Sequence, residues 1–221
     1  MTISVEVRPD AAAAGRYAAD LVAERIRAVT ADGRRFAWAI SGGTSPAPMF
    51  RRLGELDLPW ASIDTWQVDE RVAPAGDPDR NRTIAEPELP EQALDGVRWM
   101  PVEDEDLEAA AARYAATLPA RFDVVHLGLG PDGHTASLVP GDPVLDERER
   151  TVAVTGPYQG RRRMTFTYPA LERATWIVWL VDGAEKREVL TKLIARDTSI
   201  PASGVTIPDQ LVVTDVDVAT A

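Results

Sequence analysis

The sequence of 221 residues contains no cysteine. Disulfide bonds, thiolate nucleophiles and cysteine-ligated zinc are therefore excluded. No apolar run approaches the roughly 18 residues that suggest a membrane span. The first ten residues, MTISVEVRPD, lack the basic and apolar regions of a secretory signal. We therefore expect a cytoplasmic protein that does not bind membranes, and the lack of cysteine is compatible with that location.

Positive charge is also scarce. The chain has 24 Lys and Arg residues against 35 Asp and Glu residues, which gives a formal net charge of −11. Such a surface repels nucleic acid and anionic membranes, so we expect no nucleic-acid partner. An anionic metabolite could bind only where a site supplies its own cations, as a few Arg or Lys side chains beside glycine-rich loops.

Predicted strands and helices alternate along the chain. Apolar spacing near 3.6 and helix-favouring residues predict helices over residues 11–30, 47–55, 105–118 and 184–195. Short apolar runs predict strands over residues 36–40, 63–68, 98–102, 122–127, 151–154, 164–167, 177–181 and 211–214. Several of these strands are apolar on both faces, as in a parallel sheet covered by helices on each side. We find no repeat or linker, so we expect one domain over residues 1–221.

The segment HLGLGPDGHTASL, residues 126–138, contains a match to the dinucleotide pattern G-x-G-x-x-G that begins at Gly128. In a dinucleotide site a long helix opens at the third glycine, and an acidic residue ends the next strand. Here the Pro-Gly pair at 140–141 stops any helix after one or two turns. The next predicted strand ends in Thr-Gly at 155–156. We therefore expect no nicotinamide cofactor.

The same loop carries Asp132 and His134 on either side of a glycine. Imidazole suits proton transfer near neutral pH, and a neighbouring carboxylate could orient the ring or raise its basicity. Alternatively, Asp132 could cap a short helix that begins near Thr135. We favour the catalytic interpretation in this loop. The other histidine, His126, falls inside a predicted strand, where a hydrogen-bonded core residue is expected, and its spacing from His134 does not suit a metal site.

Residues 41–46, SGGTSP, follow a predicted strand and are typical of an anion-binding loop. Glycines let backbone N–H groups face a ligand, hydroxyls add donors, and Pro46 opens the next helix. A helix N-terminus stabilises an anion by only about 0.3–1 kcal/mol, so charged partners are needed. Arg71 and Lys186 are candidates. Each alone would be an ordinary surface cation, but both follow strands whose carboxyl ends share the ligand-binding edge of an α/β sheet.

Together these segments resemble the 6-phosphogluconolactonase family. The matching segments are residues 41–46, residues 69–71 with Asn81, residues 127–138, residues 163–167, Lys186 and residues 201–203. The resemblance spans nearly the whole chain. It implies a modified Rossmann-like, mostly parallel sheet with helices on both faces, similar to glucosamine-6-phosphate deaminase and ribose-5-phosphate isomerase. It also implies hydrolysis of 6-phospho-D-glucono-1,5-lactone, a sugar phosphate lactone, in the pentose phosphate pathway, with no metal and no organic cofactor.

On this resemblance we predict that His134 is the general base and that Asp132 supports the loop or the ring. The predicted substrate- and phosphate-binding residues are Ser41, Gly42, Gly43, Thr44, Arg71, Asn81, Gly130, Arg163 and Lys186. Backbone N–H groups of residues 42–43 or of the Gly130 loop are candidate oxyanion donors. Asp69 and Glu70 could contribute to chemistry, brace the strand end or orient Arg71.

The chain departs from the family pattern at two places. Family members often carry S-N-Y where this chain has Arg80-Asn81-Arg82, and an asparagine where it has Glu172. Arg80 and Arg82 could hold phosphate or be surface charges, and Glu172 puts in doubt any role given to the family asparagine.

Two other functions compete with the lactonase prediction. The glucosamine-6-phosphate deaminase pattern has tyrosine in place of Arg71 and an Asn-Glu pair that this chain lacks. A non-catalytic sugar-phosphate sensor would keep the phosphate loop, but the retention of Asp132 and His134 argues against it. We expect a monomeric enzyme.

Overall fold

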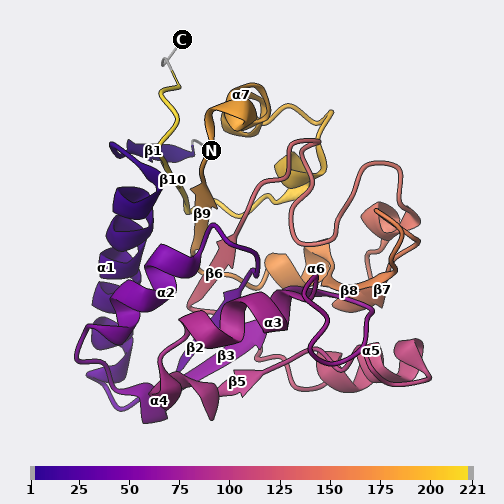
Figure 1. The fold of residues 1–221 in the computed structure, drawn as a ribbon, viewed down its shortest axis with the longest axis horizontal. Coiled ribbons are helices and arrows are strands. Elements are labelled where there is room, and N and C mark those ends of the chain that lie inside the picture. Colours follow the sequence, from indigo (N-terminus) through magenta and orange to yellow (C-terminus); the bar gives the residue numbers. More distant parts are fainter. Residues whose placement is uncertain (1–2, 219–221) are drawn as a thin grey trace.

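A sheet of parallel strands runs through the centre of the computed structural model, which describes residues 3–218 (Figure 1). Within that range the sheet has seven strands. Their order is β1 (Ser4–Val7), β10 (Gln210–Thr214), β9 (Ile177–Val181), β6 (Val124–Leu127), β2 (Phe36–Ile40), β3 (Ile63–Gln67) and β5 (Val97–Arg98).

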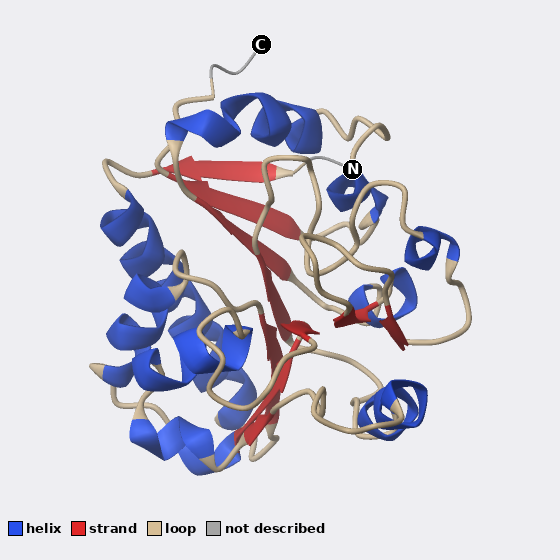
Figure 2. Cartoon of the chain, turned by 45° about the vertical axis from the view of Figure 1, so that its right-hand side comes forward, coloured by secondary structure: helices blue, strands red, loops and turns tan. Residues whose placement is uncertain are grey.

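Helices cover both faces of this sheet, as Figure 2 shows. One face packs against α1 (Ala11–Thr30), α2 (Ala47–Gly54), α3 (Asn81–Ala85) and α4 (Glu91–Leu94). The other face packs against α5 (Leu107–Ala115), α6 (Tyr168–Leu171) and α7 (Arg187–Ile194). The predicted α/β class, a mostly parallel sheet between helices, is therefore confirmed.

The longest helix and the central strands follow directly from their sequences. Asp10 caps α1, because its side chain accepts a hydrogen bond from the N–H of Ala13 at 2.7 Å. The buried side chains of α1 recur every three or four residues, so one face of the helix meets the sheet. Strand β9, IVWLV, is buried throughout, as expected of a strand with a helical layer on each side.

A second, smaller sheet was not predicted. Its strands are β4 (Asp69–Arg71), β8 (Arg163–Phe166) and β7 (Val152–Val154), and all of its pairings are antiparallel. Residues 151–154 and 164–167, which were predicted as strands without a stated partner, thus form β7 and β8 of this second sheet. The chain leaves β3 at Val68, whose carbonyl oxygen accepts a hydrogen bond from the N–H of Phe166 at 2.7 Å. Pairing with this distant segment cannot be deduced from local apolar patterns.

Other differences lie at the ends of elements. The predicted strand over residues 98–102 is reduced to β5, and the N–H of Met100 instead bonds to the side-chain oxygen of Gln67 at 3.0 Å. Edge strand β1, SVEV, was missed because it is short and partly polar. The predicted helix over residues 184–195 begins as a 3₁₀ turn, Ala184–Lys186, and continues as α7.

The connections between strands place a crevice at one point of the sheet. From β2 the chain moves outward through β3 and β5, then returns to add β6 on the opposite side of β2. Loops that follow strands on either side of such a switch point diverge and leave room for a ligand. We therefore expect the site where β2 and β6 end.

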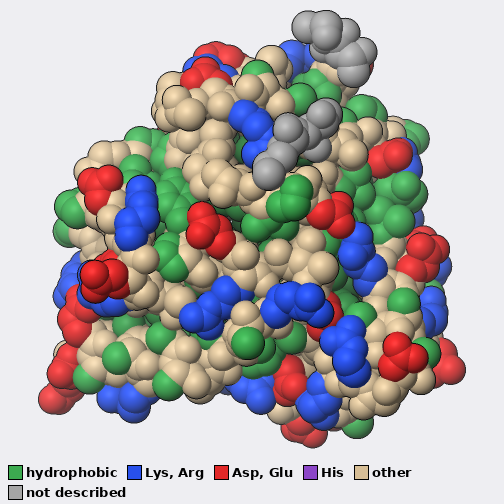
Figure 3. Space-filling model, turned by 180° about the vertical axis from the view of Figure 1, so that it is seen from behind, with side chains coloured by type: hydrophobic (Ala, Val, Ile, Leu, Met, Phe, Trp, Pro, Cys, Tyr) green, Lys and Arg blue, Asp and Glu red, His purple; other side chains and the backbone are tan. Residues whose placement is uncertain are grey.

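The surface opposite the view of Figure 1 carries interspersed acidic and basic side chains, with no large area of one sign (Figure 3). Of the helices in residues 3–218, none combines the length and apolar character needed to cross a membrane.

Candidate active site

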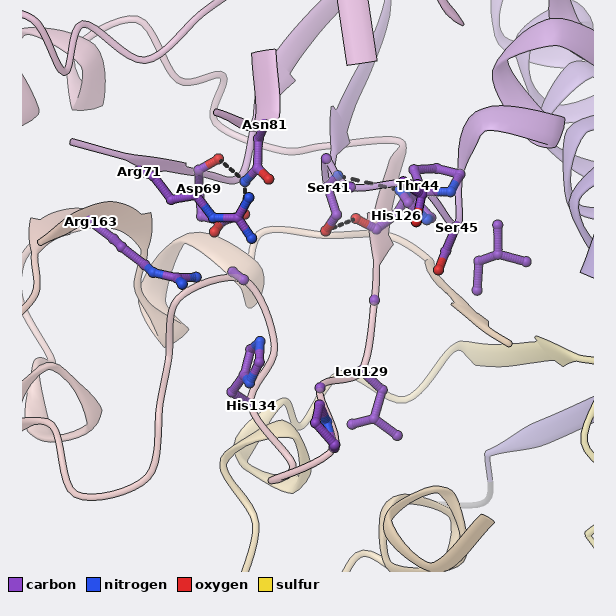
Figure 4. A pocket seen from close by; sticks show the side chains of 18 of the residues that line it. Ser41, Thr44, Ser45, Asp69, Arg71, Asn81, His126, Leu129, His134 and Arg163 are labelled. Carbon is purple, nitrogen blue, oxygen red and sulfur yellow. Dashed lines mark hydrogen bonds between the residues drawn. The ribbon is translucent and has the colours of Figure 1, made fainter. Parts of the chain in front are cut away.

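A cavity of about 310 Å³ lies at the carboxyl ends of β2, β6 and β9 (Figure 4). It is bordered on one side by the small antiparallel sheet. The predicted residues that line it are Ser41, Gly42, Gly43, Thr44, Arg71, Asn81, Gly130, His134, Arg163 and Lys186. Asp132 does not line the cavity, but its carboxylate contacts Nδ1 of His134. The fold thus brings together residues that lie up to 145 positions apart in the sequence.

Two arginines enter the cavity from neighbouring strands. Arg71 of β4 and Arg163 of β8 are directly paired across the antiparallel ladder. Arg163 is 4% exposed, and this burial lowers the pKa of its guanidinium below the ordinary value. Its Nη2 donates to the side-chain oxygen of Gln159 at 3.1 Å, while its buried Nε meets no acceptor among the described residues. A buried guanidinium with an unused donor, as in Arg163, is suited to an anionic ligand.

Lys186 supplies a third cation from the opposite side of the cavity. Its Nζ lies 3.6 Å from Oδ1 of Asp182, which follows β9. The hydroxyl of Ser45 donates to the same carboxylate oxygen. Asp182 therefore ties the Lys186 side chain to the loop of residues 41–46.

His134 and Asp132 form the pair that the sequence suggested. Nδ1 of His134 lies 2.5 Å from Oδ1 of Asp132, and the other carboxylate oxygen accepts a hydrogen bond from the hydroxyl of Tyr158 at 2.9 Å. Burial would raise the pKa of Asp132, but these hydrogen bonds outweigh it, so the pKa lies below the ordinary value. The carboxylate is therefore ionised near neutral pH and can orient the imidazole.

The loop around this pair contains no helix. Residues 131–141 form turns, with a bridge between Thr135 and Leu138 and a positive φ of 48° at Ala136. The alternative that Asp132 caps a helix is therefore wrong. The N–H of Gly130 donates to the carbonyl oxygen of His134 at 2.8 Å, so it is not available as an oxyanion donor. Residues 42–43 remain the candidates for that role.

Comparison with known proteins identifies the family. The model of the family "Glucosamine-6-phosphate isomerases/6-phosphogluconolactonase" matches residues 9–214. The chain belongs to this family. It is 33% identical over 208 residues to a 6-phosphogluconolactonase of Nostoc sp., and the match covers 88% of this chain and 86% of that protein.

Solved structures of other proteins share the fold of this chain. A crystal structure of a 6-phosphogluconolactonase from Shewanella baltica superposes with a TM-score of 0.86 at 22% identity, covering 97% of this chain and 98% of the other. A monomeric glucosamine-6-phosphate deaminase superposes with a TM-score of 0.85 at 19% identity, covering 96% and 97%. The fold alone therefore does not distinguish the two activities within the family, and the site residues must.

Asp69 and Glu70, which follow β3, have different surroundings. Asp69 lines the cavity, and its Oδ2 accepts a hydrogen bond from the Ser137 hydroxyl at 2.7 Å. Asp69 also binds the Asn81 amide, through its carbonyl oxygen at 2.9 Å and its Oδ1 at 3.2 Å.

Glu70 is fully buried and does not face the cavity. Its carboxylate accepts hydrogen bonds from the backbone N–H groups of Arg71, Asn81 and Arg82 at 2.7–2.9 Å. Of the alternatives that the sequence left open, Glu70 braces the strand end and the start of α3.

His126 is both a core residue, as predicted, and part of the cavity wall. It is 1% exposed, and burial lowers its pKa from the ordinary 6.5 to about 3, so the ring is neutral. Its Nδ1 accepts a hydrogen bond from the N–H of Ser41 at 3.3 Å, and the Ser41 hydroxyl donates to the His126 carbonyl oxygen at 3.2 Å. His126 thus fixes the first residue of the glycine-rich loop, a role that the strand pattern did not reveal.

The positions where the chain departs from the family pattern lie away from the cavity. Arg80 is buried and binds Glu103 and Glu70, while Arg82 pairs with Glu86 at 3.0 Å. Glu172 lies at the end of α6. None of these three side chains lines the cavity as the structure describes it.

Proposed function

We propose that this chain hydrolyses 6-phospho-D-glucono-1,5-lactone to 6-phosphogluconate, the second step of the oxidative pentose phosphate pathway. One observation carries the proposal: His134, held by Asp132, shares a single cavity with the cations of Arg71, Arg163 and Lys186. A base and a phosphate-binding set in one cavity suit an ester that carries a phosphate group. The curated relatives that bear the lactonase name support it.

The base in this proposal is Nε2 of His134. When Nδ1 carries the proton and its N–H donates a hydrogen bond to Asp132, Nε2 keeps its lone pair. It accepts a proton from water while the water oxygen attacks the lactone carbonyl carbon. The tetrahedral intermediate then expels the ring oxygen, which takes the proton from Nε2 of His134 and leaves the imidazole neutral again. General-base assistance of this kind typically contributes about 10²–10⁴-fold.

The cations and the glycine-rich loop supply binding. Arg71, Arg163 and Lys186 hold the phosphate, with hydroxyl donors from Ser41 and Thr44. The backbone N–H groups of residues 42–43 face the developing oxyanion. Asn81 and Gly130 shape the wall beside the sugar. Because the phosphate is remote from the reacting carbonyl, it orients the substrate without taking part in bond breaking.

The proposal extends to the surroundings of the enzyme. We propose one domain over residues 1–221 that acts as a cytoplasmic monomer on a small-molecule substrate, without a metal or organic cofactor and without nucleic-acid or membrane partners. In support of one domain, both core clusters pack on one sheet. Size-exclusion chromatography with light scattering tests the monomer, for which a mass of 24.0 kDa is expected.

The experiment is a lactone hydrolysis assay. 6-Phosphogluconolactone is generated enzymatically, and acid release is followed at about pH 6.5 with wild type, His134→Ala and Asp132→Asn, each with and without EDTA. We expect wild type to accelerate hydrolysis in EDTA and His134→Ala to lower kcat by about 10²–10⁴-fold with little change in KM. Wild type that fails to exceed the buffer rate would refute the lactonase. Ammonia release from glucosamine 6-phosphate in a parallel sample would indicate a deaminase.

A further inference from the structure

A tight turn over residues 158–161 contacts the cavity from the small-sheet side. Tyr158 and Arg161 exchange backbone hydrogen bonds of 2.9 and 3.2 Å, and the two residues between them, Gln159 and Gly160, have φ values of 51° and 79°. Two successive positive φ angles are typical of type I′ hairpin turns, which favour Asn or Gly. Glycine meets this requirement at position 160. Glutamine at position 159 is strained, which points to a role for its side chain.

The first residue of the turn reaches the candidate base pair. The Tyr158 hydroxyl donates to Oδ2 of Asp132 at 2.9 Å, and the other oxygen of the same carboxylate contacts Nδ1 of His134. The Tyr158 ring also meets the His134 ring edge to face, with centroids 5.5 Å apart. Tyr158 therefore holds the carboxylate from one side and the imidazole from another.

The second residue of the turn reaches the phosphate-binding side. The side-chain oxygen of Gln159 accepts a hydrogen bond from Nη2 of Arg163 at 3.1 Å, and Gln159 itself lines the cavity. The Arg163 guanidinium lies over the Tyr158 ring, 4.9 Å from its centroid. The two adjacent side chains of the turn thus contact different partners in the same site.

We propose that this turn positions both halves of the site: Tyr158 orients His134 through Asp132, and Gln159 orients Arg163. The inference rests on the proposed lactonase function. Both are positioning residues, since each acts through another side chain. The cost of the strained conformation at Gln159 is offset by the order that it gives to Arg163.

Loss of the tyrosine hydroxyl should change how Asp132 ionises. Among the described residues, the titratable or charged groups that face its carboxylate are His134, Tyr158 and Arg163. The hydroxyl stabilises the ionised carboxylate, and without it Asp132 takes up a proton at a higher pH. Burial and this carboxylate together raise the pKa of Tyr158, so its hydroxyl remains a donor through neutral pH.

The test compares Tyr158→Phe and Gln159→Gly with Tyr168→Phe. Tyr168 provides the matched control because its hydroxyl also donates a hydrogen bond, but to the carbonyl oxygen of Pro201 at 2.7 Å and not to Asp132. For Tyr158→Phe we expect kcat to fall about 10-fold and KM to change less than about twofold.

Glycine at position 159 suits the positive φ and keeps the turn, but it removes the acceptor for Arg163. For Gln159→Gly we therefore expect KM and the inhibition constant of inorganic phosphate to rise about three- to tenfold, with kcat nearly unchanged. A change in kcat alone, or none at all, would refute the role of Gln159.

A second readout does not depend on activity. The chain has two histidines, so the ring signals of His134 can be followed by NMR as the pH is lowered. In Tyr158→Phe the response of these signals to Asp132 protonation should move to higher pH, and in Tyr168→Phe it should not. Inactive wild type would refute the lactonase, while the NMR comparison would still decide the inference. If the response of the His134 signals to Asp132 protonation is unchanged in Tyr158→Phe, or shifts equally in both tyrosine variants, the inference is overturned.

Discussion

The ring of His134 lies against Gly130 so closely that a Cβ atom at position 130 would come within 2.1 Å of its Cε1 and Nδ1. A side chain at this position would displace the imidazole from Asp132. In Gly130→Ala we therefore expect kcat to fall about 100-fold, because the base is no longer aligned, while KM changes little. Steady-state kinetics with the phosphorylated lactone measures both constants.

Gly128→Ala is the matched control in the same loop, since a Cβ there meets no protein atom within 4 Å. We expect this variant to keep kcat within about threefold of wild type. Equal losses of kcat in the two variants would show that the loop tolerates no side chain at either position. The loss in Gly130→Ala would then not be due to displacement of His134.

Replacement of Glu70 should strongly lower the stability of the fold. Its buried carboxylate holds three backbone N–H groups and lies 3.5 Å from Nε of the buried Arg80. In Glu70→Ala these donors lose their acceptor, and we expect the free energy of unfolding to fall by about 3–5 kcal/mol. Glu86→Ala removes a more exposed partner of Arg82 and should cost less than about 1 kcal/mol. Urea denaturation followed by circular dichroism compares the two, and similar losses would contradict the bracing role of Glu70.

His126 predicts a pH dependence of stability. Its folded pKa, about 3, lies below the ordinary 6.5, so between these values the unfolded chain binds the additional proton. Stability from this group is complete above about pH 6.5 and is lost as the pH falls. His126→Asn keeps an acceptor for the Ser41 N–H but does not titrate. Between pH 7 and pH 5, wild type should lose about 2 kcal/mol more than this variant. Parallel losses in urea titrations at the two pH values would show that His126 is not buried as a neutral ring.

The cations of the cavity predict a specific loss of phosphate affinity. In Arg71→Ala and Lys186→Ala we expect KM to rise at least about 10-fold with a smaller change in kcat, because the phosphate contacts are made equally in the ground and transition states. Inhibition by inorganic phosphate should weaken in the same variants. Arg82→Ala is the control, since this arginine lies outside the cavity wall. Unaltered phosphate inhibition in Lys186→Ala would place the phosphate elsewhere.

The parallel sheet could be predicted from the sequence because its central strands and its longest covering helix show a pattern within their own residues. Strands β2, β3 and β9 are apolar runs, and α1 repeats its buried residues with helical spacing. The antiparallel sheet was not predicted, since β4 pairs with β8 across more than 90 residues and each strand has only three or four residues. Such pairing depends on where the parallel sheet places these two distant segments in space.

The candidate site, too, was predicted where a local motif marks it and missed where contacts depend on the fold. Asp132, His134 and the glycine-rich loop were found from their motifs, and the switch point explains why they meet. Tyr158 and Gln159 were missed because their segment carries no catalytic or binding motif, and their partners lie in another loop and in β8. A tight turn was the available signal, in the Gln-Gly pair at 159–160, but its contacts required the fold.

The pairing of β1 with β10 has a consequence for synthesis of the chain. Residues 4–7 are synthesised more than 200 residues before their partners, residues 211–214. Strands β2, β3 and β5 can pair early in translation, whereas β1 must wait unpaired while the rest of the sheet is made. This edge of the sheet can therefore form only after β10 has been synthesised, so β1 pairs late although it is made early.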